Sequence, residues 1–446
     1  MKRLRGTKVV MFAFALMPVS TLAMAQAVVD PGPRGGAAGA GGPIAGLTLK
    51  EGKFFDSGLD AFQEVASVTG SVAGTEPGLG PRFNLNSCAG CHAHPAVGGS
   101  SPADNPQVSV APPGPPPGQL ANVAGIISPK GPVREVRFST DGGVHDLFTI
   151  VSLPGTPSGC TISQPDFAGN AANLRFRIPT PVFGAGLIEA IEDATIEANV
   201  HAGKPFGIAG SVNRNGNDGT ITRFGWKAQN KSLVIFAGEA YNVEQGITNE
   251  LFPDERGEGG TQDPPACRQV VTAPQDTVHY ELTQPQKVID DVNNFANFMR
   301  FLAAPERVSF YPGVSSGQIA AGEAAFTNAG CSVCHMPSMR TGNHANASLR
   351  FKTANLFSDL LVHDIGTGDG IPQGGATGDQ FRTAPLWGIG QRLFFLHDGS
   401  ETTLLGAINR HAGPEGTRVR ENFNGAGTAP LNDTERQNLL YFLRSL

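Results

Sequence analysis

The chain of 446 residues lacks several features that would point to common partners. Beyond residue 25, no stretch reaches the roughly 18–20 apolar residues of a membrane-spanning helix, so no membrane span is expected. Basic residues are fewer than acidic ones, 33 Lys and Arg against 39 Asp and Glu, which argues against nucleic acid and anionic membranes as partners. The Gly-rich stretch 366–378 lacks the Lys-Ser/Thr of a phosphate loop, so a nucleotide site is not supported.

The first 25 residues, in contrast, have the layout of a secretory signal peptide (1–25). Basic residues up to Lys8 precede an apolar stretch at 9–22, and Ala23-Met24-Ala25 supplies a cleavage site of small residues. This segment carries four basic residues and no acid, so its removal changes the formal net charge from −6 to −10. We therefore predict an exported, periplasmic protein.

Cysteine is scarce, and its placement is informative. Four of the six cysteines lie in two Cys-x-x-Cys-His sequences. These are Cys88-Ala89-Gly90-Cys91-His92 and Cys331-Ser332-Val333-Cys334-His335. In a c-type haem site the two thiols bond to the porphyrin, and the adjacent His is the proximal iron ligand. A zinc site or a redox dithiol is the alternative for Cys-x-x-Cys alone, but the His and the export signal favour two covalently attached haem c groups.

The remaining cysteines are Cys160 and Cys267. Since an exported protein exposes free thiols to oxidation, we expect a disulfide between them, with two free buried thiols as the alternative.

The predicted fold class is mainly α, with two cytochrome-c-like domains and an irregular, partly β middle segment. After a flexible Gly/Ala/Pro-rich leader (26–46), the N-terminal haem domain covers 47–120, the middle segment 121–305 and the C-terminal haem domain 306–446. Hydrophobic periodicity predicts helices at about 47–68, 188–198, 285–302, 316–326 and 402–411, and from 432 onward, and strands at 133–138 and 174–178.

The distal iron ligands decide function, because a six-coordinate haem passes electrons whereas an open position binds a small molecule. His411 follows Leu404 and Ile408 on one face of a predicted helix, although a buried, hydrogen-bonded His is an equally good interpretation. His94 lies too near His92 to reach the opposite face of that haem. The other candidates are the Met residues and His145, His201, His279, His344, His363 and His397.

Several blocks of sequence share a pattern with a known family. They lie at 80–92 (through Cys88-Ala89-Gly90-Cys91-His92), 98–100, 183–191, 223–229, 245–253, 358–366, 382–388, 396–399 and 407–413. With these blocks, most of residues 78–446 resembles a family of exported di-haem oxidoreductases, some of them labelled thiol oxidoreductases. The C-terminal half also resembles, more distantly, bacterial di-haem cytochrome c peroxidases and the enzyme that matures a tryptophan-derived quinone.

The resemblance implies roles for particular residues. In the peroxidases, a segment like 385–399 leads into a helix that carries the second axial ligand of the C-terminal haem. The matching residue is His411, which implies ligation of that haem by His335 and His411, with His363 as the alternative. The N-terminal haem is usually the reactive one in that superfamily, with a distal carboxylate as general acid/base. Glu189 is the candidate here, against its interpretation as a carboxylate near a helix start.

Other side chains could assist the haems. Arg82, Lys227 and Arg382 could neutralise haem propionates, although such residues are mostly solvated surface. Either of the two tryptophans, Trp226 and Trp387, could relay electrons between the haems, although a large aromatic residue is more often part of the core.

Together these features predict an enzyme: a di-haem oxidoreductase with peroxidase-like chemistry at the N-terminal haem. Its partners would be a redox protein and a small substrate such as peroxide. The alternatives are a non-enzymatic electron-transfer cytochrome and a maturation enzyme that oxidises a partner protein.

Replacing both Cys88 and Cys91 by Ala should remove covalent haem from the N-terminal half only, because the second cassette keeps its own thiols. Haem staining and intact mass should show one haem in place of two. Unchanged haem content would contradict the assignment.

Overall fold

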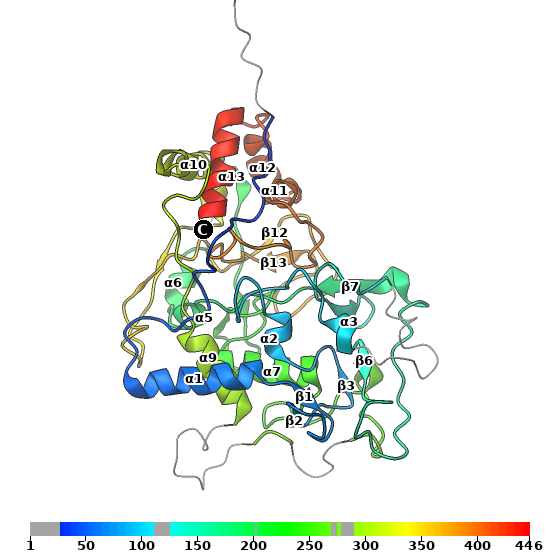
Figure 1. Cartoon of the computed structure of the whole chain (residues 1–446). Coiled ribbons are helices and arrows are strands. Elements are labelled where there is room, and N and C mark those ends of the chain that lie inside the picture. The colour runs from blue at the N-terminus through cyan, green and yellow to red at the C-terminus, as the bar shows by residue number, and fades with distance from the viewer. Residues whose placement is uncertain (1–26, 111–124, 201–202, 269–273, 278–289) are drawn as a thin grey trace, which may run out of the picture.

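The computed structural model describes residues 27–110, 125–200, 203–268, 274–277 and 290–446. The chain forms a broad lower part that contains helices α1, α7 and α9 and a narrower upper part that contains α10 to α13 (Figure 1). The predicted signal peptide lies outside the described residues, as do His201 and His279. No helix in the described part of the chain is long and apolar enough to cross a membrane.

Helices lie at both ends of the chain and between the haem cassettes. The α-helices are α1 (Leu49–Gln63), α2 (Cys88–Cys91), α3 (Gln107–Val110), α5 (Ala185–Glu189), α6 (Asp193–Glu197), α7 (Leu233–Gln245), α9 (Asp291–Phe301), α10 (Ser316–Ala329), α11 (Leu404–Asn409), α12 (Thr417–Phe423) and α13 (Asp433–Ser445). Short 3-10 helices occur at Ala171–Asn173, Pro205–Gly207, Glu258–Gly260 and Cys331–Val333.

The strands are short and form small sheets. They are β1 (Ala66–Ser67), β2 (Glu76–Pro77), β3 (Arg82–Phe83), β4 (Glu135–Phe138), β5 (Val144–His145), β6 (Phe148–Thr149), β7 (Leu174–Arg177), β8 (Asn213–Arg214), β9 (Ile221–Thr222), β10 (Met339–Arg340), β11 (Thr353–Ala354), β12 (Val362–Asp364) and β13 (Gln380–Arg382). The predicted strands β4 and β7 pair antiparallel, and β5 completes a three-stranded sheet in the order β5-β4-β7. The fold is therefore mixed, with long irregular connections, rather than mainly α as the sequence predicted.

The predicted helices are present with small changes. The helix expected at 188–198 is split into α5 and α6 on either side of Glu192, whose extended backbone serves as the N-cap of α6. The helix expected at 402–411 ends at Asn409, so His411 lies just past its end. The helix expected at 285–302 is described only from its N-cap Asp290, because 278–289 lie outside the described residues.

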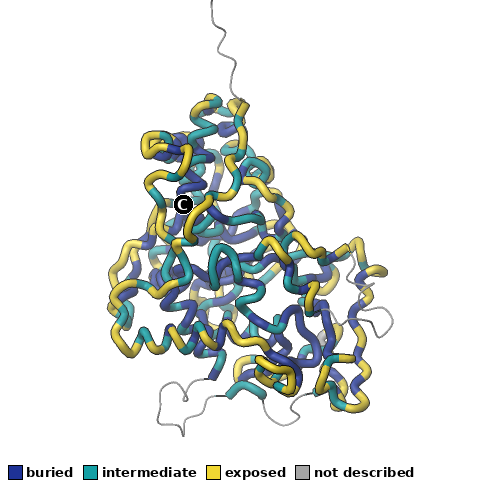
Figure 2. The backbone as a smooth tube through the Cα atoms, in the orientation of Figure 1, coloured by how far each residue is buried: buried dark blue, intermediate teal, exposed yellow. Residues whose placement is uncertain are grey.

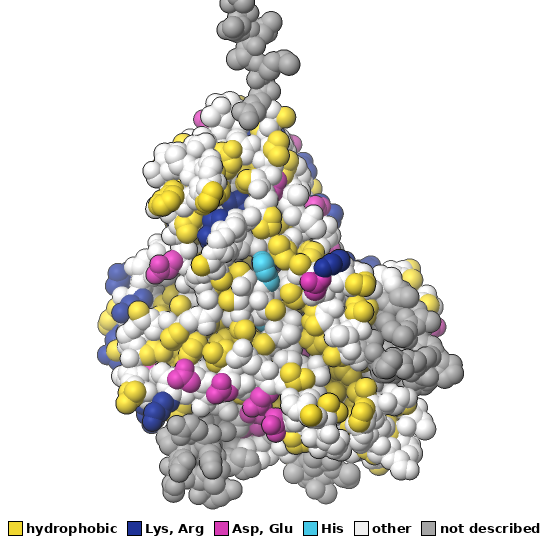
Figure 3. Space-filling view, in the orientation of Figure 1, with side chains coloured by type: hydrophobic (Ala, Val, Ile, Leu, Met, Phe, Trp, Pro, Cys, Tyr) yellow, Lys and Arg dark blue, Asp and Glu magenta, His cyan; other side chains and the backbone are white. Residues whose placement is uncertain are grey.

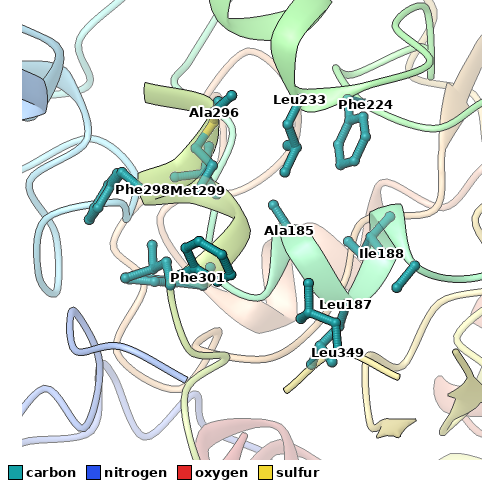
Figure 4. Close-up of a cluster of buried hydrophobic side chains, with 14 of the residues drawn as sticks. Ala185, Leu187, Ile188, Phe224, Leu233, Ala296, Phe298, Met299, Phe301 and Leu349 are labelled. Carbon is teal, nitrogen blue, oxygen red and sulfur yellow. The ribbon is translucent and has the colours of Figure 1, made fainter. Parts of the chain in front are cut away.

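The largest core joins segments from all three predicted domains. Helix α1 packs on α9, and Gly58 permits the close approach because a Cβ there would lie 2.4 Å from the Asn294 carbonyl oxygen. Phe298 of α9 contacts Phe55 and Phe62 of α1, with ring centroids 5.6 and 4.7 Å apart. Buried residues of α5, α7 and the 339–361 region complete this cluster (Figure 4), which lies inside the dark-blue buried interior of Figure 2. The N-terminal haem region is thus built on helices far away in sequence.

A second helical core lies at the narrow end. The helix predicted from residue 432 onward is α13, which begins with a capping box of Asn432 and Glu435 and packs on α10, the helix before the second cassette. A Cβ at Gly322 of α10 would collide with the Asn438 carbonyl of α13, so glycine allows this contact. The predicted disulfide Cys160–Cys267 is confirmed.

The segment predicted as a flexible leader is hydrogen-bonded across the molecule. Asp30 accepts hydrogen bonds from the Leu404 and Leu405 N–H groups at the start of α11, and its other oxygen pairs with Arg444 of α13 at 2.9 Å. Further along, the Ile44 N–H donates to the Phe301 carbonyl. The leader therefore connects the upper and lower parts of the molecule, because the Asp30 carboxylate and the Ile44 N–H form hydrogen bonds with residues of each part.

Replacing Asp30 by Ala should destabilise the fold by about 3–5 kcal/mol, because it leaves the guanidinium of Arg444, 1% exposed, without its anionic partner. Urea denaturation measures the loss. Glu323→Ala is the matched control, since it removes a half-exposed pair with Arg307 that is worth under about 1 kcal/mol. Equal losses in the two variants would contradict the prediction.

Candidate functional site

The first cassette forms the short helix α2, and His92 follows directly. The buried His92 ring donates from Nδ1 to the Gly99 carbonyl at 3.0 Å, which leaves Nε2 as the free, metal-binding nitrogen. Burial lowers the pKa of His92 to about 4, so the ring is neutral. Cys88 and Cys91 are free thiols in this structure, unlike the disulfide-bonded pair. These features are what a proximal haem ligand with two thioether positions requires.

A cavity beside this cassette, called here the N-terminal cavity, is walled by residues from distant parts of the chain. Helix α7 contributes residues at helical spacing: Phe236, Glu239, Ala240, Val243 and Glu244. The remaining lining residues are Asn84, Cys91, His92, Gln107, Val133, Arg134, Glu135, Arg137, Arg177, Ile178, Pro179, Thr180, Gly225, Trp226 and Gln229. Among these described lining residues there is no second His and no Met.

Three carboxylates face the N-terminal cavity. Glu135 is engaged by Arg137 at 2.6 Å, and Glu239 accepts a hydrogen bond from Asn230. Burial, together with the negative charges of Glu135 and Glu239, raises the pKa of Glu244 to about 8. At neutral pH Glu244 is therefore a protonated acid that can donate a proton.

The second cassette has a different backbone from the first, but its histidine makes the same kind of hydrogen bond. Gly330 ends α10 in the left-handed conformation, and Cys331–Val333 form a single 3-10 turn. His335 donates from Nδ1 to the Phe357 carbonyl at 3.0 Å, again leaving Nε2 free. Burial lowers the pKa of His335 to about 4, and the nearby His411 adds to the effect. The two cassette histidines thus share the same tautomer.

His335 and His411 line one cavity, called here the C-terminal cavity. His411 donates from Nδ1 to the Ala407 carbonyl at 2.9 Å, so its Nε2 is also free. Most other lining side chains are apolar, among them Phe326, Leu386 and Leu443. His335 and His411 are thus two neutral imidazoles of this cavity that each keep Nε2 uncommitted.

His363, the alternative ligand, also lines the C-terminal cavity but has both ring nitrogens occupied. Nε2 lies 3.0 Å from Asp359, and Nδ1 lies 3.2 Å from Glu415 and 3.8 Å from the Cys334 sulfur. Cys334, Asp359 and His363 could together hold a metal ion, but the Cys334 thiol is one that haem attachment would consume. The geometry favours His411 over His363 for an iron.

Two arginines in the lining of the C-terminal cavity show whether its side chains fit a haem. Arg382 Nη1 and Arg392 Nη2 are buried without a hydrogen-bond partner, and both residues line this cavity. Burial lowers the pKa of each to about 10, which still leaves both charged at neutral pH. Two cations, each with one unpaired guanidinium nitrogen, beside a Cys-x-x-Cys-His sequence fit the two propionates of a haem.

The other predicted propionate partners are placed elsewhere. Arg82 pairs with Asp263 at 2.9 Å, and Lys227 donates to three carbonyls and to Asp369; neither residue lines a haem cavity. In the N-terminal cavity it is Arg134 that has a buried nitrogen, Nε, without a partner. Sequence reasoning missed Arg392 and Arg134 because the sequence does not distinguish a buried arginine from a solvated one.

Trp226 lines both cavities, whereas Trp387 lines neither. The indole N–H of Trp226 donates to the Ile178 carbonyl at 2.8 Å, which holds the ring between the two cassettes. His397, one of the other candidate ligands, stacks on Phe381 with ring centroids 4.0 Å apart and lines the C-terminal cavity. His94 uses Nε2 to contact the Gln391 carbonyl at 2.7 Å, in keeping with its interpretation as a loop residue.

Glu189 lies away from the N-terminal cavity. Its carboxylate pairs with Arg300 at 2.6 Å and accepts the Leu233 N–H at 3.1 Å, which holds α5 against α9 and the start of α7. It lines two shallow surface pockets and is absent from the residues around His92. The structure therefore does not bring the predicted general acid/base to the haem, because its charge is used in helix packing.

The missed functional element is α7, which was not predicted. A signal was present: Ser232 caps the apolar run that starts at Leu233, and Gly246 ends the helix in the left-handed conformation. What the sequence could not show is that this helix lies along the cassette at 88–92, about 150 residues earlier in the chain.

Comparison with known families now identifies the class. The family described as "Di-haem oxidoreductase, putative peroxidase" matches residues 164–446, more than half of the chain. The protein belongs to this di-haem oxidoreductase family. The matched region contains the second cassette, α7 and His411, and it begins after the first cassette.

Other comparisons add little. A search of curated proteins finds no match. Similar solved structures include a hydrazine synthase of Kuenenia stuttgartiensis pressurised with xenon (16% identity, 60% of this chain and 88% of that chain, TM-score 0.30). They also include a MauG-like protein associated with microbial copper homeostasis (16%, 60% and 90%, 0.29) and the diheme peroxidase BthA of Burkholderia thailandensis (13%, 60% and 86%, 0.29). At these TM-scores the likeness carries no argument about this chain.

Proposed function

We propose that the protein is an exported, periplasmic c-type di-haem enzyme that reduces peroxide at the N-terminal haem with electrons that enter at the C-terminal haem. The observation that carries the proposal is the contrast between the cavities. The C-terminal cavity holds His335 and His411, each with a free Nε2. The N-terminal cavity has His92 and three carboxylates, with no second His or Met among its described lining residues.

The haems would be held by Cys88 and Cys91, and by Cys331 and Cys334. When bound, each haem supplies an iron that exchanges single electrons, and an iron with one open coordination position can take a peroxide ligand. The hydrogen bond from His92 Nδ1–H to the Gly99 carbonyl fixes the imidazole ring, so this side of the haem site has a defined geometry.

Reduction of peroxide to two water molecules consumes two electrons and two protons, so the site needs an acid. Glu244 is protonated at neutral pH and faces the N-terminal cavity, which suits proton donation as the O–O bond breaks. Its backbone carbonyl accepts the Asn84 N–H at 2.7 Å, which fixes α7 beside the loop that precedes the cassette. We assign to Glu244 the role predicted for Glu189.

Electrons must cross from the C-terminal to the N-terminal site. Trp226 is the aromatic residue shared by both cavities, and its hydrogen bond to Ile178 holds it in place. A basic or neutral redox protein would deliver the electrons, since the chain is acidic overall.

The experiment that tests the function is electron paramagnetic resonance of the oxidised protein before and after peroxide. We expect one low-spin and one high-spin ferric signal, with the high-spin signal lost on peroxide addition, because only one site has an open position. Two low-spin signals that peroxide does not change, before and after one-electron reduction, would leave a pure electron-transfer cytochrome.

In the same measurement, His411→Ala should convert the low-spin signal to high spin without loss of haem, because it removes the imidazole proposed as the second ligand of the C-terminal iron. His363→Ala is the matched control and should keep the low-spin signal. The opposite pattern would transfer the ligand role to His363.

Glu244→Gln should slow peroxide turnover by about 100-fold or more with haem loading unchanged, since it removes the proton donor. In the unmodified protein, turnover should fall as the pH rises through about 8, because Glu244 then loses its proton; the variant should lack this dependence. Glu189→Gln is the control. If that variant were the slow one, the original assignment of Glu189 would hold instead.

A further inference from the structure

Tyr241 lies on α7 beside the thiol that attaches the N-terminal haem. Four residues later on the same helix face, the Gln245 side-chain N–H contacts the Cys88 sulfur at 3.1 Å. Cys88 also contributes to the electrostatic environment of Tyr241 itself. The phenol ring packs edge-on against Phe295 of α9, with centroids 4.9 Å apart, so its position is fixed.

The hydroxyl of Tyr241 donates a hydrogen bond to Asp291 Oδ2 at 3.1 Å. Burial, and then the charges of Asp291 and Asp276, raise the pKa of Tyr241 well above its usual value, so the phenol stays protonated. Such a phenol can lose an electron readily only if its proton has an acceptor, and Asp291 is in place to accept it. Among the described tyrosines, Tyr241 is the one whose hydroxyl donates to a carboxylate; Tyr311 donates to the Tyr441 carbonyl.

The surface around Asp291 is negatively charged. Asp60 and Glu64 are exposed near the end of α1, and Glu76 is exposed on β2. Partial burial, followed by the charges of Asp291, Glu76 and Asp60, raises the pKa of Glu64 to about 7. The pairing of β1 with β2 places Glu76 opposite Ala66, two residues past Glu64. Figure 3 shows acidic side chains gathered low on this face, in the region where Figure 1 draws α1. Such a surface attracts cations.

We propose that Tyr241 and Asp291 form a second oxidation site, at which a cationic one-electron donor is oxidised at the surface between α1, α7 and α9. The inference rests on the proposed function, because peroxide is the oxidant. It adds an entry point for electrons that is separate from the C-terminal haem, and it assigns a positive charge to the donor.

Each half of the cycle balances. Tyr241 would give one electron toward the haem that Cys88 would hold, while its phenolic proton passes to Asp291, which leaves a neutral phenoxyl radical. The donor returns one electron to the radical, and Asp291 returns the proton. Two such cycles, with two protons from solvent, reduce one peroxide molecule to two water molecules and oxidise two donor molecules.

The test is freeze-quench electron paramagnetic resonance of the full-length di-haem protein mixed with peroxide in the absence of a donor. We expect a tyrosyl radical signal that is lost in Tyr241→Phe, which keeps the ring packing against Phe295. Tyr311→Phe is the matched control and should keep the signal. A high-spin signal that disappears with peroxide while no radical forms, or a radical that persists in Tyr241→Phe, would overturn this inference and leave the proposed function standing. A high-spin signal unaffected by peroxide would overturn both.

The charge of the donor is tested with two small reductants, hexaammineruthenium(II) and ferrocyanide, during peroxide turnover. Oxidation of the ruthenium cation should fall by about tenfold or more in Tyr241→Phe, equivalent to about 1.4 kcal/mol of barrier. The double variant Asp60→Asn, Glu64→Gln should slow oxidation of the cation, and not of ferrocyanide, while the radical signal stays unchanged. Equal rates of oxidation of the ruthenium cation and of ferrocyanide in all variants would overturn the assignment of a positive charge to the donor.

Discussion

One interaction recurs at the centre of this protein: a buried or partly buried imidazole whose Nδ1–H is bonded to a backbone carbonyl. His92 uses Gly99, His335 uses Phe357 and His411 uses Ala407. The hydrogen bond selects the tautomer and fixes the ring, while burial lowers the pKa of each ring and so keeps it neutral. The backbone that supplies each carbonyl must therefore be held rigidly, and the packing of the surrounding helices serves that need.

The two cavities differ in the side chains that face their cassettes. Helix α7 brings Glu239 and Glu244 to the first, whereas the segment after α11 brings His411 to the second. A neutral acid suits proton transfer to a bound small molecule, and a second imidazole suits a six-coordinate iron that passes electrons. Trp226 lines both cavities, so it connects the site that suits electron transfer with the site that suits proton transfer.

Local signals predicted much of the secondary structure. Hydrophobic periodicity placed α9 and α13 correctly, because an amphipathic face is defined within one or two turns of helix. The site was less predictable. Glu189 was chosen from a sequence block, but the nearby Arg300, 111 residues later, uses its charge. Glu244 gave no comparable signal, since its raised pKa arises from burial and from Glu135 and Glu239.

The sequence by itself determined the two Cys-x-x-Cys-His sequences and the pairing of Cys160 with Cys267, because these depend on residue identity, adjacent positions and the count of remaining thiols. Only the tertiary structure decided that His363 has both nitrogens occupied while His411 has one free, and that α7 lies along the first cassette. Those outcomes depend on contacts between segments tens to hundreds of residues apart, and such contacts are set by the packing of the whole chain.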